Sequence, residues 1–439
     1  MVVIAVVLAG VATVIALNGG GVSGGSTAAS TLTPSTIMDS WQSQQSSLSS
    51  QSSSSQSQQT SVSVDSGKEQ VGAVATHDKP VPESGAVDRS YFSDALFIGD
   101  SRSEGFKLYS ELDNATYFVY KGLSVETVNT KEVITAPDGT QQTVMNALKQ
   151  KQFGKVYIML GINELGWTNT NAFIQKYGAL VDAVKKYNPN AIVYVQSILP
   201  VSDKKNGDPI YNNENINKFN GLIQDMVNQK QVYYVNPAES VMKDGLLIHE
   251  ASTDGVHLNK KYCMVWRDYL MTHTVRKQQN KRSVFMKKIA VAVMTVVLLC
   301  FMGGCAGAPA KDVDINKVAD DLMTQITYKD ELGKLTDDMF DSVYKIDRSL
   351  IKQAVAFTSS GATAEEIVAI ELNNADDVKT VETALKERIK YQRDGYADYG
   401  PEEVPKLDNA VIKSSGNYIF MSVSDDHAKA EEILKSYLG

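Results

Sequence analysis

Residues 91–102, YFSDALFIGDSR, decide how the surrounding region folds. The apolar run at 95–98 predicts a buried strand, and Gly99-Asp100-Ser101 is a turn of small residues that opens onto a helical stretch at 104–112. A strand end fixes the position of a serine, and the first N–H groups of a helix stabilise an oxyanion. The pattern therefore indicates a nucleophile at Ser101.

Two later stretches carry the polar groups that such a serine needs. Gly161-Ile162-Asn163 follows an apolar run at 156–160, and Asp254-Gly255-Val256-His257 lies near the end of the same region. The spacing of three residues lets one turn direct a carboxylate at one imidazole nitrogen while the other nitrogen faces the serine. His257 and Asp254 are therefore the expected partners of the serine.

These stretches, with Gly122 between the first two, stand in the order typical of the SGNH (GDSL-type) hydrolase family, which residues 88–275 resemble. The resemblance implies an α/β fold in which helices flank a parallel sheet. It also implies ester hydrolysis without a cofactor or a metal ion. Two positions depart from the family pattern: GxND reads GINE, with Glu164, and Arg102 replaces the leucine after the serine. Both departures limit what the pattern says about the substrate.

The resemblance also assigns a role to each polar residue. Ser101 is the expected nucleophile, His257 the general base and Asp254 the residue that orients the histidine. The oxyanion hole is expected to consist of the backbone N–H groups of Ser101 and Gly122 and the side-chain amide of Asn163.

Structural roles are the alternatives for the same residues. Gly-Asp-Ser and Asn163 both suit turns, and Asp254 can cap a helix with His257 at its end. Gly122 permits the close backbone approach that any strand-to-loop glycine permits. His249 is a competing base, although no aspartate stands at the same spacing before it.

Three further side chains lie near these motifs. Glu164 and Trp167 are expected to line the mouth of the cleft, with core packing as the alternative for Trp167. Cys263 is expected to be buried packing, because nothing around it would lower its pKa. The three cysteines predict no disulfide framework, and the sequence contains no Cys/His cluster with metal-ligand spacing.

Alternating strands and helices indicate the parallel α/β layout within 88–275. Expected strands lie at 96–98, 117–120, 156–160, 192–197 and 232–235, and expected helices at 144–149, 171–187, 215–228 and 260–271. Ligands bind beyond the carboxyl ends of parallel strands, and Ser101, Gly122 and Asn163 each follow one.

The C-terminal region, residues 311–439, has a different pattern and is expected to form a separate small α+β domain. Helices are predicted at 318–326 and 375–393 and at the C-terminus, and strands at 354–358, 367–370, near 411 and at 418–423. The region resembles uncharacterised bacterial lipoprotein domains through GATAEE at 361–366 and PEEVP at 401–405. No catalytic constellation stands out in it.

Two apolar segments set the expected location. Residues 1–17 predict a signal anchor, and residues 18–87, rich in Ser, Gln and Gly, predict a disordered stalk. Residues 276–310 join a basic stretch to an apolar run that ends at Cys305, which resembles a lipoprotein signal with a lipidated cysteine. Because basic residues before such a run belong on the cytoplasmic side, we expect two separate products, the second a lipoprotein that begins at Met286 and has Cys305 as its lipidated N-terminus.

The charge distribution excludes nucleic acid as a partner. The formal net charge is −8, and residues 311–439 carry 26 acidic and 16 basic residues, so no footprint for nucleic acid exists. We expect a membrane-anchored, extracytoplasmic serine esterase or deacylase that forms an acyl-enzyme. Its expected substrates are short acyl esters of cell-surface glycans. The alternatives are an O-acyltransferase with the same triad and a non-catalytic surface assembly module.

Overall fold

Two five-stranded sheets organise the part of the chain that the computed structural model describes, residues 75–275 and 313–438. These residues fall within one unit, Gln70–Gly439. The expected anchor at 1–17, most of the expected stalk and the segment around Cys305 lie outside the described residues. Among the helices of the described ranges, none combines the length and apolar character needed to cross a bilayer.

The first sheet belongs to residues 75–275, here called the hydrolase domain. All its strands are parallel, in the order β2-β1-β5-β6-β7, which confirms the predicted α/β layout. The strands are β1 (Ala95–Gly99), β2 (Thr116–Val119), β5 (Lys155–Met159), β6 (Ile192–Gln196) and β7 (Tyr233–Val235).

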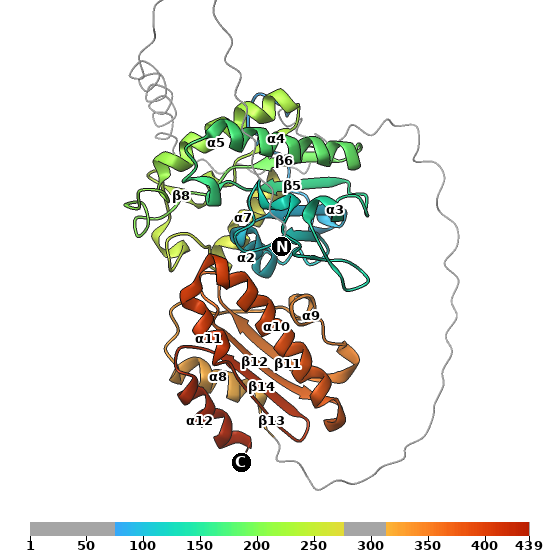
Figure 1. Ribbon diagram of the computed structural model, residues 1–439, viewed down its shortest axis with the longest axis vertical. Helices are drawn as coiled ribbons and strands as arrows, with labels where there is room; N and C mark the ends of the chain where they lie inside the picture. The colour runs from blue at the N-terminus through green and yellow to red at the C-terminus, as the bar shows by residue number, and fades with distance from the viewer. Residues whose placement is uncertain (1–74, 276–312, 439) are drawn as a thin grey trace, which may run out of the picture. The chain divides into compact units, whose positions relative to one another are not determined.

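Helices cover both faces of this sheet, because successive side chains of each strand point to opposite sides. Phe97 of β1 contacts Phe106, which in turn packs on Trp266, whereas Leu96 joins the core beneath Phe173 on the other face. Figure 1 shows α4 and α5 together over one side of the sheet. The helices are α2 (Ser101–Tyr109) and α7 (Lys260–Thr272) on the first face, and α4 (Thr170–Tyr187) and α5 (Asn213–Lys230) on the second.

The remaining elements of the hydrolase domain are short. They are the helices α3 (Val144–Ala147) and α6 (Ala238–Val241), the strand pairs β3 (Ile134–Thr135) with β4 (Gln141–Gln142) and β8 (Met242–Lys243) with β9 (Leu246–Leu247), and 3₁₀ turns at Arg89–Phe92, Thr127–Asn129, Ile162–Glu164 and His249–Ala251.

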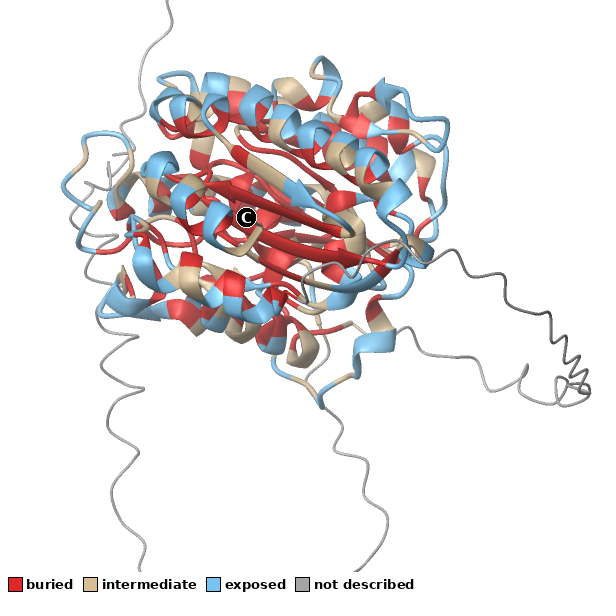
Figure 2. Cartoon of the chain, turned by 90° about the horizontal axis from the view of Figure 1, so that it is seen from below, coloured by how far each residue is buried: buried red, intermediate tan, exposed pale blue. Residues whose placement is uncertain are grey.

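The second sheet belongs to residues 313–438, here called the C-terminal domain. It is antiparallel, in the order β10-β11-β12-β14-β13, and helices accompany it, so the predicted separate α+β domain is confirmed. Figure 2 shows central strands coloured as buried beneath helices whose outer faces are exposed. The elements are β10 (Gly333–Lys334), β11 (Ile351–Thr358), β12 (Glu366–Leu372), β13 (Val411–Ser415), β14 (Tyr418–Val423), α8 (Ile315–Gln325), α9 (Asp337–Tyr344), α10 (Val378–Tyr399), α11 (Val404–Asp408) and α12 (His427–Leu438), with 3₁₀ turns at Arg348–Leu350, Ala375–Asp377 and Pro401–Glu403.

Helix α10 runs six residues beyond its predicted end at Arg393 and stops at Tyr399. Gly400 follows, and Pro401, which lacks an N–H donor and disfavours helical backbone at the residue before it, begins the next turn. The extension matters because it carries Tyr399 to the end of the helix. The sequence patterns also missed α9 and β10, which are short.

Candidate active site

The turn after β1 places Ser101 at the first position of α2. Asp100 caps this helix, because its side chain accepts a hydrogen bond from the backbone N–H of Arg102 at 3.0 Å. A side chain at Gly99 would meet Ser103 and lie 2.9 Å from the carbonyl oxygen of Met159, so glycine is needed for the helix to start directly at the strand end. The helix therefore begins at the serine itself, three residues before the predicted stretch.

The structure brings the three predicted catalytic residues together. Nε2 of His257 lies 2.9 Å from Oγ of Ser101, and Nδ1 of His257 lies 2.7 Å from Oδ2 of Asp254. The other carboxylate oxygen of Asp254 accepts hydrogen bonds from the backbone N–H groups of Val256 and His257, at 2.8 and 2.9 Å. One turn of chain thus fixes both the carboxylate and the imidazole.

The charge state of Asp254 suits an orienting role. Burial alone would raise its pKa, but the charge and hydrogen bonds of His257 and the two backbone donors outweigh burial, so the pKa of Asp254 is lowered. An ionised carboxylate accepts from Nδ1–H of His257 and leaves the lone pair of Nε2 free to face a hydroxyl. This arrangement can take a proton from Ser101.

Gly122 and Asn163 lie in loops that follow β2 and β5, the two neighbours of β1. Gly122 has a φ of +70°, a backbone conformation that glycine adopts without strain. The side-chain amide of Asn163 donates to the carbonyl oxygen of Leu123 at 2.9 Å, so the two loops are tied together. Both predicted oxyanion groups therefore stand beyond the same sheet edge as Ser101.

Glu164 was predicted to line the mouth of the cleft, and this prediction is wrong. Its side chain is fully buried and accepts a hydrogen bond from the backbone N–H of Val125 at 2.6 Å, and burial raises its pKa to about 8. The carboxyl group turns inward because it ties the Gly122 loop to the loop that carries Asn163. Trp167 is partly buried and packs against the core on the α4 and α5 face.

The structure also places His249 and Cys263. His249, the competing base, is exposed and lies 2.7 Å from Asp203, with no contact to Ser101. Cys263 is buried in the apolar core, as predicted, and burial raises the pKa of its thiol.

Arg102 places a buried cation directly after the nucleophile. Its guanidinium is enclosed, donates from Nη1 to the carbonyl oxygen of Leu199, and has no hydrogen-bond partner at Nε or Nη2 among the described residues. Burial lowers the pKa of Arg102 and raises that of the neighbouring Asp100 to about 6. This departure from the family's leucine is therefore a feature of the site and not of the surface.

Tyr399 was not predicted from the sequence. Its hydroxyl lies 2.8 Å from Oγ of Ser101 and 2.7 Å from Nε2 of His257, although it comes from the C-terminal domain. No local pattern marks this tyrosine, because it is one of several in α10. Within residues 75–275 and 313–438, no group of His, Cys, Asp and Glu side chains has the arrangement of a metal site.

A cavity of about 1090 Å³ lies between the two domains. Its lining mixes charged and aromatic side chains, among them Glu104, Tyr120, Lys121, Arg388 and Tyr391. Ser101, His257 and Asp254 do not line it, but Lys121, which precedes Gly122, does. The cavity therefore adjoins the loop that carries Gly122, here called the oxyanion loop after its predicted role, and Ser101 does not line it.

Comparisons with known proteins identify two families in the chain. Residues 97–261 match the model of the GDSL-like lipase/acylhydrolase family, and residues 325–424 match a domain of unknown function, DUF4358. No curated protein matches the chain.

Several solved structures are similar to part of the chain. A suspected platelet activating factor from Streptococcus pneumonia is 21% identical, with a TM-score of 0.33, over 42% of this chain and 88% of the other. A GDSL-like lipase from Bacteroides thetaiotaomicron is 14% identical, with a TM-score of 0.33, over 42% and 89%. Est24, a carbohydrate acetylesterase from Sinorhizobium meliloti, is 15% identical, with a TM-score of 0.30, over 40% and 95%.

The parallel sheet, the ordered motifs and the match at residues 97–261 lead to one conclusion. The chain carries an ester-hydrolysing GDSL-like (SGNH) lipase/acylhydrolase domain, followed by a DUF4358 domain.

Proposed function

We propose that Ser101, His257 and Asp254 cleave acyl esters through an acyl-enzyme. The observation that carries this proposal is the continuous chain of contacts from Asp254 through His257 to Ser101, at 2.7 and 2.9 Å. His257 takes the proton of Ser101 as Oγ attacks the ester carbonyl, and then gives it to the departing alkoxide. A water molecule then attacks the acyl-enzyme in the same way, with His257 as the base, and the acid is released.

The oxyanion of each tetrahedral intermediate is proposed to accept hydrogen bonds from the backbone N–H groups of Ser101 and Gly122 and from the amide of Asn163. The helix start at Ser101 and the positive φ of Gly122 support this assignment. Loss of one such donor costs on the order of 10²–10³ in turnover.

Short acyl groups on a glycan are the proposed substrate class. The cavity beside the oxyanion loop supports a polar leaving group, because charged and aromatic side chains such as Lys121 and Tyr120 bind sugars better than alkyl chains. The test is a panel of acetyl to long-chain esters together with acetylated oligosaccharides, using the full chain and Ser101→Ala. Turnover of acetyl esters that disappears in Ser101→Ala supports the proposal, and equal turnover by both proteins contradicts it.

An O-acyltransferase that uses the same triad is the second candidate. The cavity beside the loop of Gly122 favours it, because charged and aromatic side chains such as Lys121 and Tyr120 could also hold a sugar acceptor. In this case a sugar hydroxyl replaces water in the second step. Product analysis with added acceptor sugars distinguishes the two: transfer yields an acylated acceptor, and hydrolysis yields free acid.

We also propose that the hydrolase domain works at the extracytoplasmic face of a membrane and that the sequence joins two separate products, the second a lipoprotein that begins at Met286 and carries lipid on Cys305. The apolar and basic patterns at 1–17 and 276–310 support this, and both segments lie outside the described residues. Terminal peptide mapping of native membranes is the test. A single species of 47.9 kDa without lipid on Cys305 would refute the separation.

A further inference from the structure

Tyr399, the last residue of α10, contacts both members of the Ser101–His257 pair. Its hydroxyl lies 2.8 Å from Oγ of Ser101 and 2.7 Å from Nε2 of His257, while these two atoms lie 2.9 Å apart. The three polar atoms thus form a nearly equilateral triangle. One phenolic oxygen from the C-terminal domain engages the nucleophile and its base at once.

The hydroxyl of Tyr399 lies where the ester and the attacking water must bind. An ester carbonyl must come within roughly 3–3.5 Å of Oγ, and an attacking water must hydrogen-bond to the base. Tyr399 also covers the oxyanion loop, because a Cβ on Gly122 would lie 3.7 Å from its ring. The side chain therefore occupies the space of both the substrate and the hydrolytic water.

Tyr399 also competes for the base. With Nδ1–H of His257 directed at Asp254, Nε2 has one lone pair, which accepts from one hydroxyl only. Burial raises the pKa of Tyr399, so its hydroxyl stays protonated and able to donate. When Tyr399 donates to Nε2, the hydroxyl of Ser101 no longer donates to the base directly and donates instead to the phenol oxygen of Tyr399.

Access to the nucleophile is closed by the same contact. Ser101 is 1% exposed and His257 is 3% exposed. A nucleophile buried to this extent cannot meet an ester carried by a glycan until a neighbouring group moves. Tyr399 is the side chain that must leave.

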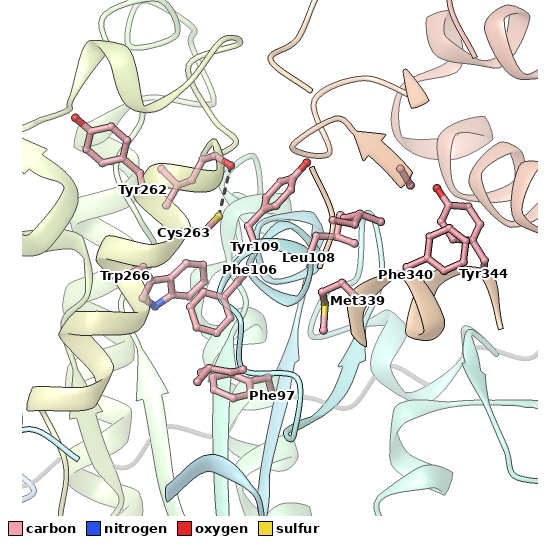
Figure 3. Close-up of a cluster of buried hydrophobic side chains, with 14 of the residues drawn as sticks. Phe97, Phe106, Leu108, Tyr109, Tyr262, Cys263, Trp266, Met339, Phe340 and Tyr344 are labelled. Atoms are coloured by element: carbon pink, nitrogen blue, oxygen red, sulfur yellow. Dashed lines mark hydrogen bonds between the residues drawn. The ribbon is translucent and has the colours of Figure 1, made fainter. Parts of the chain in front are cut away.

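The surface that holds the C-terminal domain is packed like a protein core. Leu108 and Tyr109 of α2 belong to the same buried apolar cluster as Met339 and Phe340 of α9, as Figure 3 shows. The hydroxyl of Tyr109 donates to the carbonyl oxygens of Thr358 and Ser359 in the C-terminal domain. Such complementarity indicates a specific interface.

Two glycines allow the backbones to approach at this interface. A Cβ on Gly105 of α2 would lie 2.7 Å from the carbonyl oxygen of Ser360, and one on Gly333 would lie 2.6 Å from the ring of Tyr109. One glycine comes from each domain. Any larger residue at either position would force the two surfaces apart.

Buried polar groups fix the register of the interface. Nζ of Lys121 lies 2.9 Å from both Glu104 of its own domain and Gln392 of α10. The hydroxyl of Tyr391 adds a contact of 3.3 Å to Glu104. Because an unpaired buried charge is costly, this network specifies where α10 lies across the hydrolase domain.

We propose that residues 313–438 are a dedicated lid of the hydrolase domain, and that Tyr399 holds its active site closed until the substrate displaces it. The proposal rests on the proposed function, since closure matters only if Ser101 is the nucleophile. The C-terminal domain itself covers the surface of the hydrolase domain around Gly105, Leu108 and Tyr109. If the chain is cut within 276–312, the same surface joins two products into a complex.

The experiment measures the rate at which a small fluorophosphonate probe labels Ser101 in the full chain. Tyr399→Phe keeps the ring but removes both hydrogen bonds, so labelling is expected to accelerate roughly threefold to tenfold. Tyr399→Ala removes the ring as well and is expected to accelerate labelling further. Asp398→Asn is the matched control: it removes the exposed ion pair with Lys131 from the position next to Tyr399 on the same helix, and it should label at the wild-type rate.

The outcomes distinguish the lid proposal from the proposed function of Ser101. Labelling of Ser101 at equal rates in the wild type, Tyr399→Phe and Tyr399→Ala overturns the lid and leaves the proposed function standing. If the double variant Ser101→Ala/Tyr399→Ala is labelled as fast as Tyr399→Ala, the proposed function is overturned. Loss of ester turnover in Tyr399→Phe also overturns the lid, because the hydroxyl would then take part in the reaction.

Discussion

Nε2 of His257 lies within hydrogen-bond distance of two hydroxyl groups, Ser101 at 2.9 Å and Tyr399 at 2.7 Å. The first belongs to the proposed nucleophile and the second to the C-terminal domain. Since a neutral imidazole has one acceptor nitrogen, the two hydroxyls cannot both donate to it. In the proposed mechanism, the balance between them sets how often Ser101 is ready to attack.

Asp254→Asn is expected to lower kcat by a factor on the order of 10⁴, because an asparagine amide favours the wrong tautomer of His257. The overall fold should persist, since Asp254 is replaced by a side chain of the same shape. Steady-state kinetics on an acetyl ester, with circular dichroism as the folding control, provide the measurement. A wild-type kcat would show that Asp254 does not orient the base.

Gly105→Ala is expected to weaken the interface between the domains. Alanine is the better helix former, but its Cβ would meet the carbonyl oxygen of Ser360 at 2.7 Å, and such overpacking costs about 1–3 kcal/mol. Gly221→Ala, in helix α5 with open space around it, is the control and should gain about 0.5–1 kcal/mol. Urea unfolding compares the two. Equal effects would argue against a tight contact at Gly105.

Lys121→Met is expected to destabilise the protein by about 3–5 kcal/mol, because it leaves Glu104 buried without its cation. Burial alone would raise the pKa of Glu104, and Lys121 is the main group that lowers it. Adding Glu104→Gln should recover part of the loss. Lys131→Met, which breaks an exposed pair with Asp398, should cost less than about 1 kcal/mol. Similar losses in both single variants would contradict a buried pair.

Glu164→Gln should flatten the pH dependence of stability. Burial raises the pKa of Glu164 from 4.5 to about 8, so the folded chain binds the proton more tightly than the unfolded chain. This contribution is complete below pH 4.5 and is lost as the pH rises through about 8. Thermal unfolding of the wild type between these values should show a falling Tm that the variant does not share. Glu126→Gln, at an exposed ion pair with Lys176, should keep the wild-type slope.

Much of the hydrolase fold could be predicted because its signals are local. The apolar run before Ser101, the glycines and the spacing of Asp254 and His257 each follow from one short stretch of chain. Glu164 was misplaced because sequence position does not tell whether a carboxyl group points outward or back to a neighbouring N–H. Its burial depends on Val125, 39 residues away.

Tyr399 could not be predicted for the same physical reason. It lies 298 residues from Ser101, and its contact depends on how two domains pack. Glycine at 105 and 333 is explained only by the surface that each one faces. Side-chain pairing across an interface leaves no period or spacing in the sequence.

Ser101 is proposed to carry the acyl group during turnover. Full chain and the Tyr399→Ala variant would be mixed with an activated acetyl ester, quenched in acid and mapped by peptide mass spectrometry. We expect an acetyl group on the peptide that contains Ser101, in larger amount in Tyr399→Ala, and none on that peptide in Ser101→Ala. Turnover of the ester without an acetyl group on Ser101 would contradict it.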